Sequence, residues 1–288
     1  MSDSATEDVS PATAFAVLAD STRIDILRAL AENSQESVSF SDLRERVGTA
    51  DSGQFNYHLG KLVGKFVQKD DDGYRLTTAG FQVYGAILAG TYTDTVEFDP
   101  VTLDEQCLHC GHSLTVSYVE EHLRVSCDDC ERIQVEFAFP PGAFEGRDPE
   151  ALLETLRQRL RAVVPLAQRG TCPTCWGRTE TRLTTDTLTR SNEEILLVST
   201  VCSRCGDEIR ASPGALLLDE PAVVAAYYDH GIDLRERPVW TLSWLSQKAV
   251  ETISTDPLRA QVTVPIADET LLATIEADGT VSAIEREA

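Results

Sequence analysis

The residues best suited to chemistry are eight cysteines, which fall into four Cys-x-x-Cys pairs with none left over. The pairs are Cys107 and Cys110, Cys127 and Cys130, Cys172 and Cys175, and Cys202 and Cys205. Thiolates at this spacing are typical zinc ligands, and two such pairs complete a tetrahedral four-sulfur site when a hairpin brings them together. Alternating apolar runs between the paired motifs predict those hairpins. The sequence therefore predicts two structural zinc sites per chain, each in a zinc ribbon.

Other roles for these cysteines are weighed against the structural one. His109 and His112 could each replace a cysteine as ligand, but four sulfurs already saturate a tetrahedral site. A redox role would need a thioredoxin-like setting, which the hairpin spacings do not offer. Catalytic zinc keeps one position open, and no pair of nucleophile and base stands out elsewhere in the sequence. We therefore expect a protein that is not an enzyme.

The two cysteine-rich segments resemble each other beyond their cysteines. Pro141-Gly142 followed by Asp148-Pro149 is matched by Pro213-Gly214 followed by Glu220-Pro221. Each ribbon thus leads into a Pro-Gly turn and a helix, which indicates an internal duplication over about 105–168 and 170–233. In the second copy, a turn at 190–192 is expected to join the two strands.

Nearer the N-terminus, residues 51–66 are predicted to form an amphipathic helix. Phe55, Leu59, Leu62 and Phe66 recur at spacings of three and four, so they share one face. Asp51 is placed to cap the helix. The remaining face carries groups that can bond base edges, followed by lysines that can reach phosphate. The predicted DNA contacts on this helix are Gln54, Asn56, Tyr57, His58, Lys61 and Lys65, although His58 could equally serve packing beneath the helix.

A hairpin is predicted directly after this helix, in residues 67–76, with its turn at Asp72-Gly73. Arg75 and Lys69 are its natural phosphate contacts. Residues 38–40 can add a short third strand, and Ser41 is expected to cap the helix that precedes the recognition helix. These parts together predict a winged helix-turn-helix.

Residues 11–90 resemble the ArsR-type winged-helix repressors. The Ala-Asp-Ser-Thr-Arg-Ile segment at 19–24, the Tyr-His-Leu-x-x-Leu motif at 57–62 and the hairpin occur in the expected order. The resemblance implies a DNA-binding regulator whose last helix, near 81–88, pairs with its copy in a homodimer. The other interpretation is that this helix packs on its own chain. The N-terminal region lacks cysteine, so the metal-sensing chemistry of that family does not carry over.

The charge of the chain is unevenly distributed. The formal net charge is −22, yet residues 12–90 hold eight basic against ten acidic residues, whereas residues 91–288 hold 17 against 34. This lysine-poor, acidic composition looks like that of proteins from salt-loving archaea. No run of eighteen apolar residues and no secretory signal occur, so we expect a cytoplasmic protein with no membrane contact.

The predicted fold is α+β, with an N-terminal winged helix-turn-helix followed by two zinc-ribbon-like units and a closing β-meander. The expected domains are 10–90, 105–168, 170–233 and 238–288. The function expected is sequence-specific regulation of transcription on double-stranded DNA, with the zinc-ribbon region serving dimerisation, effector sensing or contact with the transcription machinery. The alternative is a polymerase-interaction module without sequence specificity, because a winged helix followed by a zinc ribbon resembles the general factor TFE.

Overall fold

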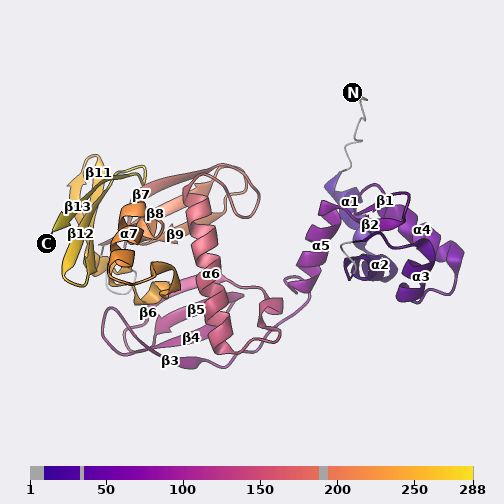
Figure 1. The fold of residues 1–288 in the computed structure, drawn as a ribbon, viewed down its shortest axis with the longest axis horizontal. Helices are drawn as coiled ribbons and strands as arrows, with labels where there is room; N and C mark the ends of the chain where they lie inside the picture. Colours follow the sequence, from indigo (N-terminus) through magenta and orange to yellow (C-terminus); the bar gives the residue numbers. More distant parts are fainter. Residues whose placement is uncertain (1–9, 33–35, 188–193, 288) are drawn as a thin grey trace. The chain divides into compact units, whose positions relative to one another are not determined.

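The computed structural model describes residues 10–32, 36–187 and 194–287 and has a mixed α+β fold (Figure 1). These residues divide into two compact units. Unit 1 holds the described residues up to Thr95 together with Pro140–Gly142. Unit 2 holds Val96–Phe139 and the described residues from Ala143 onward. Each unit has its own cluster of buried apolar side chains.

Five helices form most of unit 1, and each begins at a side chain that accepts a backbone N–H. The helices are α1 Pro11–Leu18, α2 Ser21–Ala31, α3 Phe40–Val47, α4 Ser52–Leu62 and α5 Thr78–Leu88. Ser10, Asp20, Asp51 and Thr77 cap α1, α2, α4 and α5. The cap of α3 is Ser39, which accepts from the Asp42 amide, so the prediction of Ser41 was wrong. Both serines lie within three residues of Asp42, and only the backbone geometry decides which of them is the cap.

The predicted hairpin is present as β1 Val67–Lys69 and β2 Tyr74–Leu76, which pair antiparallel. Its loop spans 70–73 rather than a two-residue turn, because the Asp70 carboxylate accepts the backbone N–H groups of Asp72 and Gly73. Val38 forms a single antiparallel bridge with Tyr74, in place of a longer third strand. At Gly73 an added Cβ would lie 2.3 Å from the Val38 carbonyl oxygen, so this close approach requires glycine.

The first cysteine-rich segment of unit 2 forms a four-stranded antiparallel sheet. Its strands are β3 Val101–Gln106, β4 Ser113–Val119, β5 His122–Cys127 and β6 Arg132–Ala138, in that order. The expected pair of strands corresponds to β4 and β5, and β3 and β6 extend the sheet on either side. The 3-10 turn η1 Pro141–Phe144 and the long helix α6 Pro149–Gln168 follow.

The second cysteine-rich segment repeats this order of elements with one strand fewer. Strands β7 Thr179–Thr187, β8 Glu194–Cys202 and β9 Glu208–Ala211 form an antiparallel sheet, followed by η2 Pro213–Leu217 and α7 Pro221–Asp229. In both copies the Pro-Gly pair opens a 3-10 turn, and the acidic residue before the next proline takes the helix N-cap position. The expected turn at 190–192 lies outside the described residues.

The last described segment is an antiparallel meander of four strands, three of which the sequence predicted. The strands are β10 Val250–Thr255, β11 Leu258–Ile266, β12 Glu269–Ile275 and β13 Val281–Glu287. Strand β10 was not predicted, because only one of its residues, Val250, packs against the core. The four short 3-10 turns η3 Leu234–Glu236, η4 Val239–Thr241, η5 Ser243–Leu245 and η6 Gln247–Ala249 lead into this sheet.

A single apolar core joins all these parts of unit 2. It contains Leu114 and Val125 from the first sheet, Val198 from the second, and Trp244 and Val262 from the C-terminal region. Helix α6 runs past both ribbon sheets (Figure 1), and its buried residues Leu152, Leu156, Leu160 and Val164 belong to the same core. The ribbons are therefore packed parts of one folded unit.

Candidate metal centres and the exposed face of helix α4

The eight cysteines gather into two groups of four. Cys107, Cys110, Cys127 and Cys130 form one group, and Cys172, Cys175, Cys202 and Cys205 form the other. Within each group all four sulfur atoms lie within 4.8 Å of one another. The Sγ atoms of Cys107 and Cys130 are 3.6 Å apart, and those of Cys175 and Cys202 are 3.5 Å apart. A tetrahedral ion with sulfur at about 2.3 Å needs sulfur–sulfur separations of about 3.8 Å, so both groups could hold a metal ion.

The backbone positions these sulfurs by the same turn at each pair. The amide of the first cysteine donates to the carbonyl five residues on, from Cys107 to His112, from Cys172 to Gly177 and from Cys202 to Asp207. The residue after the second cysteine has a left-handed backbone at all four pairs. The φ values are +79° at Gly111, +54° at Glu131, +61° at Trp176 and +76° at Gly206. The two groups are thus built alike, as the internal duplication predicts.

Backbone N–H groups also point at the sulfurs. The amides of His109, Thr174 and Arg204 lie 3.4 Å from the Sγ atoms of Cys107, Cys172 and Cys202. Such donors stabilise the thiolate form that binds metal.

The local environment moves the thiol pKa values apart. The backbone amide of His112 lowers the pKa of Cys110 to about 6, and that of Cys205 lowers the pKa of Cys202 to about 6. Burial instead raises the pKa of Cys130 to about 12. Four thiolates at this separation repel one another strongly, so a bound cation is required before all four can ionise.

Two histidines lie close to the first group. The metal-binding atoms of each group are cysteine sulfurs, and His112 hydrogen-bonds Cys110, which raises the pKa of its ring. The carbonyl oxygen of His109 accepts a hydrogen bond from Lys248, and the His112 ring lies 3.8 Å from the Asp129 carboxylate.

In unit 1, helix α4 has a buried face and an exposed face. Phe55, Leu59 and Leu62 are buried in the unit 1 core, and Phe66 is buried just beyond the helix. Asp51 accepts the backbone N–H groups of Gly53 and Gln54, as predicted for its cap. The helix ends at Leu62, where Val63 turns to an extended conformation, so the predicted helix of 51–66 is one turn too long.

The predicted DNA-contacting residues fall into two sets. Gln54, Asn56, Tyr57 and Lys61 are exposed on α4, and Arg75 is exposed on β2. The Lys61 ammonium lies 5.3 Å from the centre of the Tyr57 ring, so these two side chains occupy the same patch of surface. The amide oxygen of Gln68 accepts two hydrogen bonds from the Arg75 guanidinium and orients it on the hairpin.

Two of the predicted contacts are corrected. His58 is only 7% exposed, and its Nδ1 lies 3.2 Å from a carboxylate oxygen of Asp20, the cap of α2. It therefore packs between two helices, and its assignment as a DNA contact was wrong. Lys65 lies in the turn after α4 and is half-buried, so it does not belong to the exposed face of that helix. His58 and Lys65 both lie within the stretch of helical apolar spacing, which continues to Phe66. That spacing therefore does not show that α4 ends at Leu62.

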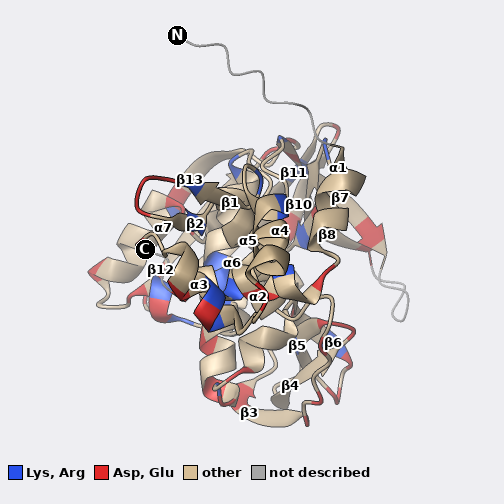
Figure 2. Ribbon diagram, turned by 90° about the vertical axis from the view of Figure 1, so that its right-hand side faces the viewer, with Lys and Arg blue, Asp and Glu red and all other residues tan. Residues whose placement is uncertain are grey.

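Charged side chains of both signs surround this surface. Acidic and basic residues alternate along α3, which carries Asp42, Arg44, Glu45 and Arg46 (Figure 2). At the hairpin tip, the hydrogen bond from the Ser37 hydroxyl, at 2.6 Å, is the main cause that lowers the pKa of Asp70. This carboxylate therefore has a structural role in the loop and also lies 3.4 Å from the Arg75 guanidinium.

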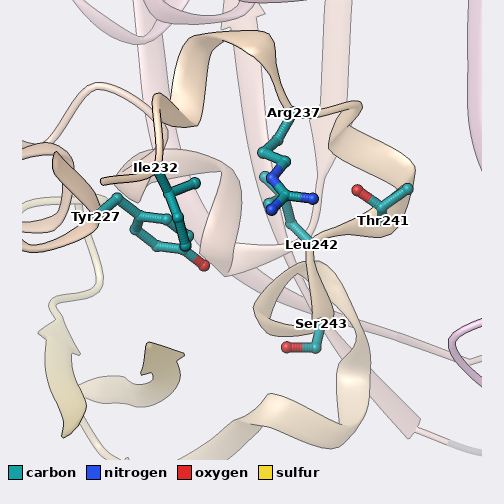
Figure 3. A pocket seen from close by; sticks show the side chains of 6 residues that line it. All are labelled: Tyr227, Ile232, Arg237, Thr241, Leu242 and Ser243. Atoms are coloured by element: carbon teal, nitrogen blue, oxygen red, sulfur yellow. The ribbon is translucent and has the colours of Figure 1, made fainter. Parts of the chain in front are cut away.

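Unit 2 contains a small hollow between α7 and the 3-10 turns that follow it. Its volume is about 140 Å³, and it is lined by Tyr227, Ile232, Arg237, Thr241, Leu242 and Ser243. Figure 3 shows the Arg237 side chain extending between Ile232 and Thr241. Ligand sites commonly exceed about 300 Å³, and none of these six residues is a histidine or a carboxylate that could activate Ser243. The hollow does not resemble a catalytic site.

No helix in the described ranges combines the length and the apolar character needed to cross a lipid bilayer.

Two family models match parts of the chain. No curated protein and no solved structure matches the chain. Residues 11–87, which contain all five helices and the hairpin of unit 1 apart from the end of α5, are similar to the family described as domain of unknown function DUF7347. Residues 104–281, more than half of the chain, match a second family model and include both cysteine groups. The chain belongs to this second family, described as domain of unknown function DUF7351.

Proposed function

We propose that the protein is a sequence-specific DNA-binding regulator of transcription whose helix α4 lies in the major groove. The observation that carries the proposal is the division of α4 into two faces. Phe55 and Leu59 are fixed in the core, while the side chains that can hydrogen-bond a base edge stay exposed. A helix of this kind, held by a helical scaffold and followed by a hairpin, is what major-groove readout needs.

The neighbouring elements support this assignment. The Asp51 cap fixes the N-terminal end of α4, from which Gln54, Asn56 and Tyr57 project. Lys61 comes one turn later and Arg75 stands on the β1–β2 hairpin, so both can contact phosphates. These features support a winged helix-turn-helix, and with the ArsR-type motifs of the sequence they favour a regulator over a general DNA-binding protein.

In this proposal the C-terminal region binds two zinc ions and acts as two zinc ribbons. Four cysteine sulfurs at tetrahedral separation are a donor set that zinc prefers, and they leave no open position for catalysis. The region would serve for dimerisation, effector sensing or protein contact. Helix α5 leaves Phe81 and Leu88 exposed, which supports the expected homodimer with recognition helices about 34 Å apart.

The test is binding of the full-length protein to genomic DNA fragments, with selection of the preferred sequence. Gln54→Ala should relax the preference at one base pair, with a loss of about 1–3 kcal/mol for the best site. Lys61→Ala should weaken binding to all sequences about equally and make it less dependent on salt. Arg28→Ala, which removes an exposed charge from α2, is the matched control.

Two results would contradict the proposal. One is that neither α4 variant changes affinity or site preference. The other is binding without any preferred sequence together with co-purification with RNA polymerase, which would favour the general-factor alternative.

A further inference from the structure

One of the three tryptophans is placed differently from the other two. Trp240 and Trp244 are buried in the core of unit 2, whereas the side chain of Trp176 is 79% exposed. Trp176 directly follows Cys175, at the tip of the turn that carries the first cysteine pair of the second ribbon. An indole exposed to this extent adds little to the apolar core of unit 2.

The backbone conformation at Trp176 is also unfavourable for tryptophan. Its φ of +61° lies in the left-handed region, which bulky side chains adopt only at a cost in free energy. The equivalent position of the first ribbon is Gly111, with φ +79°, and the position after the last cysteine pair is Gly206, with φ +76°. The fold therefore accepts glycine at this point of the turn. Tryptophan adds something that the turn itself does not require.

Two arginines belong to the same pair of cysteine turns as this indole. The Arg204 side chain packs against the residue after Trp176, since an added Cβ on Gly177 would lie 2.8 Å from the Arg204 Cβ. Its Nη1 lies 3.5 Å from the Cys175 carbonyl oxygen. Arg178 is two residues beyond Trp176, and its carbonyl accepts both the amide and the hydroxyl of Ser203 at 2.9 and 3.1 Å. The two cysteine turns are thereby tied together at the base of this cluster.

The charges of these arginines are not neutralised by neighbours. Arg182 and Arg210, on the adjacent strands, pair with Glu180 and Asp186. Among the described residues, no carboxylate lies within ion-pair distance of Arg178 or Arg204. The Asp207 carboxylate, near the same turn, accepts the Thr174 hydroxyl at 2.7 Å. Trp176 is thus an exposed aromatic side chain on a pair of turns that also carries two arginines without a carboxylate partner among the described residues, in a unit that is otherwise strongly acidic.

We propose that Trp176, Arg178 and Arg204 form a binding site for single-stranded nucleic acid. A base stacks on the indole, and the two guanidinium groups contact the flanking phosphates. The strand must be single, because the bases of a duplex are already stacked on their neighbours and cannot reach a protruding indole. The site belongs to the second ribbon only, since Gly111 offers no aromatic surface. It does not depend on α4 reading duplex DNA.

The experiment uses the full-length, zinc-loaded protein and fluorescently labelled oligo-deoxythymidine and oligouridine, with anisotropy as the readout. The wild type should bind both, and Trp176→Gly should lose roughly tenfold in affinity. Trp176→Phe keeps a stacking ring and should retain part of the binding. Arg178→Ala combined with Arg204→Ala should weaken binding and reduce the salt dependence by about one phosphate contact for each arginine. Arg182→Ala, whose charge is already paired, should leave the affinity unchanged.

A second readout follows from the burial of the other tryptophans. Oligonucleotide should quench the intrinsic fluorescence of the exposed indole in the wild type and have little effect in Trp176→Gly. A Gln54→Ala and Lys61→Ala double variant should keep full single-strand binding, which separates this site from the proposed duplex-reading helix. The proposal is overturned if Trp176→Gly binds single strands as well as the wild type. It is also overturned if no oligonucleotide binds at low salt, which would leave a protein partner as the role of Trp176.

Discussion

The indole Nε1 of Trp244 donates a hydrogen bond of 2.8 Å to the hydroxyl oxygen of Tyr227, and this pair joins η5 to α7 inside the core of unit 2. Trp244 is fully buried. Trp244→Phe leaves the buried hydroxyl without its donor and removes part of a large side chain. We expect a loss of about 2–4 kcal/mol in the free energy of unfolding, measured by urea denaturation.

The double-mutant cycle with Tyr227→Phe separates the hydrogen bond from the lost volume. If the bond matters, the cost of Trp244→Phe should be smaller in the Tyr227→Phe background by about 1 kcal/mol. Strictly additive losses would show that the bond contributes nothing to stability.

Removal of one cysteine group should remove one metal ion. The Cys107→Ser and Cys130→Ser double variant should retain half of the metal measured in the wild type, because the second group of four is untouched. Since metal binding supplies folding free energy, thermal unfolding of unit 2 should begin at a lower temperature. Metal content is measured by plasma mass spectrometry on the purified protein.

The control for that experiment is His112→Ala. This ring lies close to the first group, but the four metal-binding atoms of that group are cysteine sulfurs. Its metal content should equal that of the wild type. A loss of metal in this variant would assign the histidine as a ligand and contradict a four-sulfur site.

The cap of α4 should be important for the stability of unit 1. Asp51→Ala removes the acceptor of two backbone N–H groups and should cost about 0.5–2 kcal/mol. Asp51→Asn keeps an acceptor at the same position and should recover most of this loss. Asp71→Ala, an exposed acidic residue at the hairpin tip, serves as the control for the change in charge. Thermal unfolding monitored by circular dichroism at helical wavelengths gives the comparison.

The Asp70 carboxyl should titrate below the ordinary range of aspartate. The Ser37 hydroxyl is the main cause of its lowered pKa, and the amides of Gly73 and Asp72 contribute. A pKa lowered by folding means that the carboxylate stabilises the hairpin above the unfolded-state value, and that this contribution disappears as the pH falls through the folded-state value. Ser37→Ala should raise the Asp70 pKa, measured by carbon NMR of the side-chain carboxyl. The exposed Ser52→Ala should leave it in place.

Replacing Trp176 by the residue of the first ribbon should stabilise the protein while it abolishes single-strand binding. Trp176→Gly removes a bulky side chain from a left-handed backbone, and we expect a gain of about 1 kcal/mol in the free energy of unfolding. Trp176→Ala keeps a Cβ at the same φ and should not show the gain. A loss of stability in the glycine variant would mean that the indole supports the turn.

Patterns that depend on local spacing predicted much of this fold. The period of Phe55, Leu59 and Leu62 fixed the buried face of α4, because residues three and four apart share a side of any helix. Four Cys-x-x-Cys pairs predicted two groups of four sulfurs, because two strands between successive pairs form a hairpin that brings those pairs together. The meander was predicted from alternation in the same way, and the structure has its strands in consecutive order.

What could not be predicted depends on contacts between distant residues. The burial of His58 follows from its position beside Asp20, which is far away in sequence. The end of α4 at Leu62 follows from the bridge between Val63 and Val67, while the apolar period continues to Phe66. The left-handed backbone at Trp176 could be predicted from the sequence, because the equivalent residue of the first copy is a glycine, Gly111. Aligning the two copies residue by residue would have revealed it.

The shared core of unit 2 also bears on the history of the duplication. Leu114 and Val198 come from different copies, yet both are sealed into the same interior as the closing strands. Deletion of either copy would expose the apolar side chains of the other copy that now pack against it. Each cysteine-rich segment therefore depends on the other for its buried core, and a substitution at an interior position of one must fit the side chains of the other.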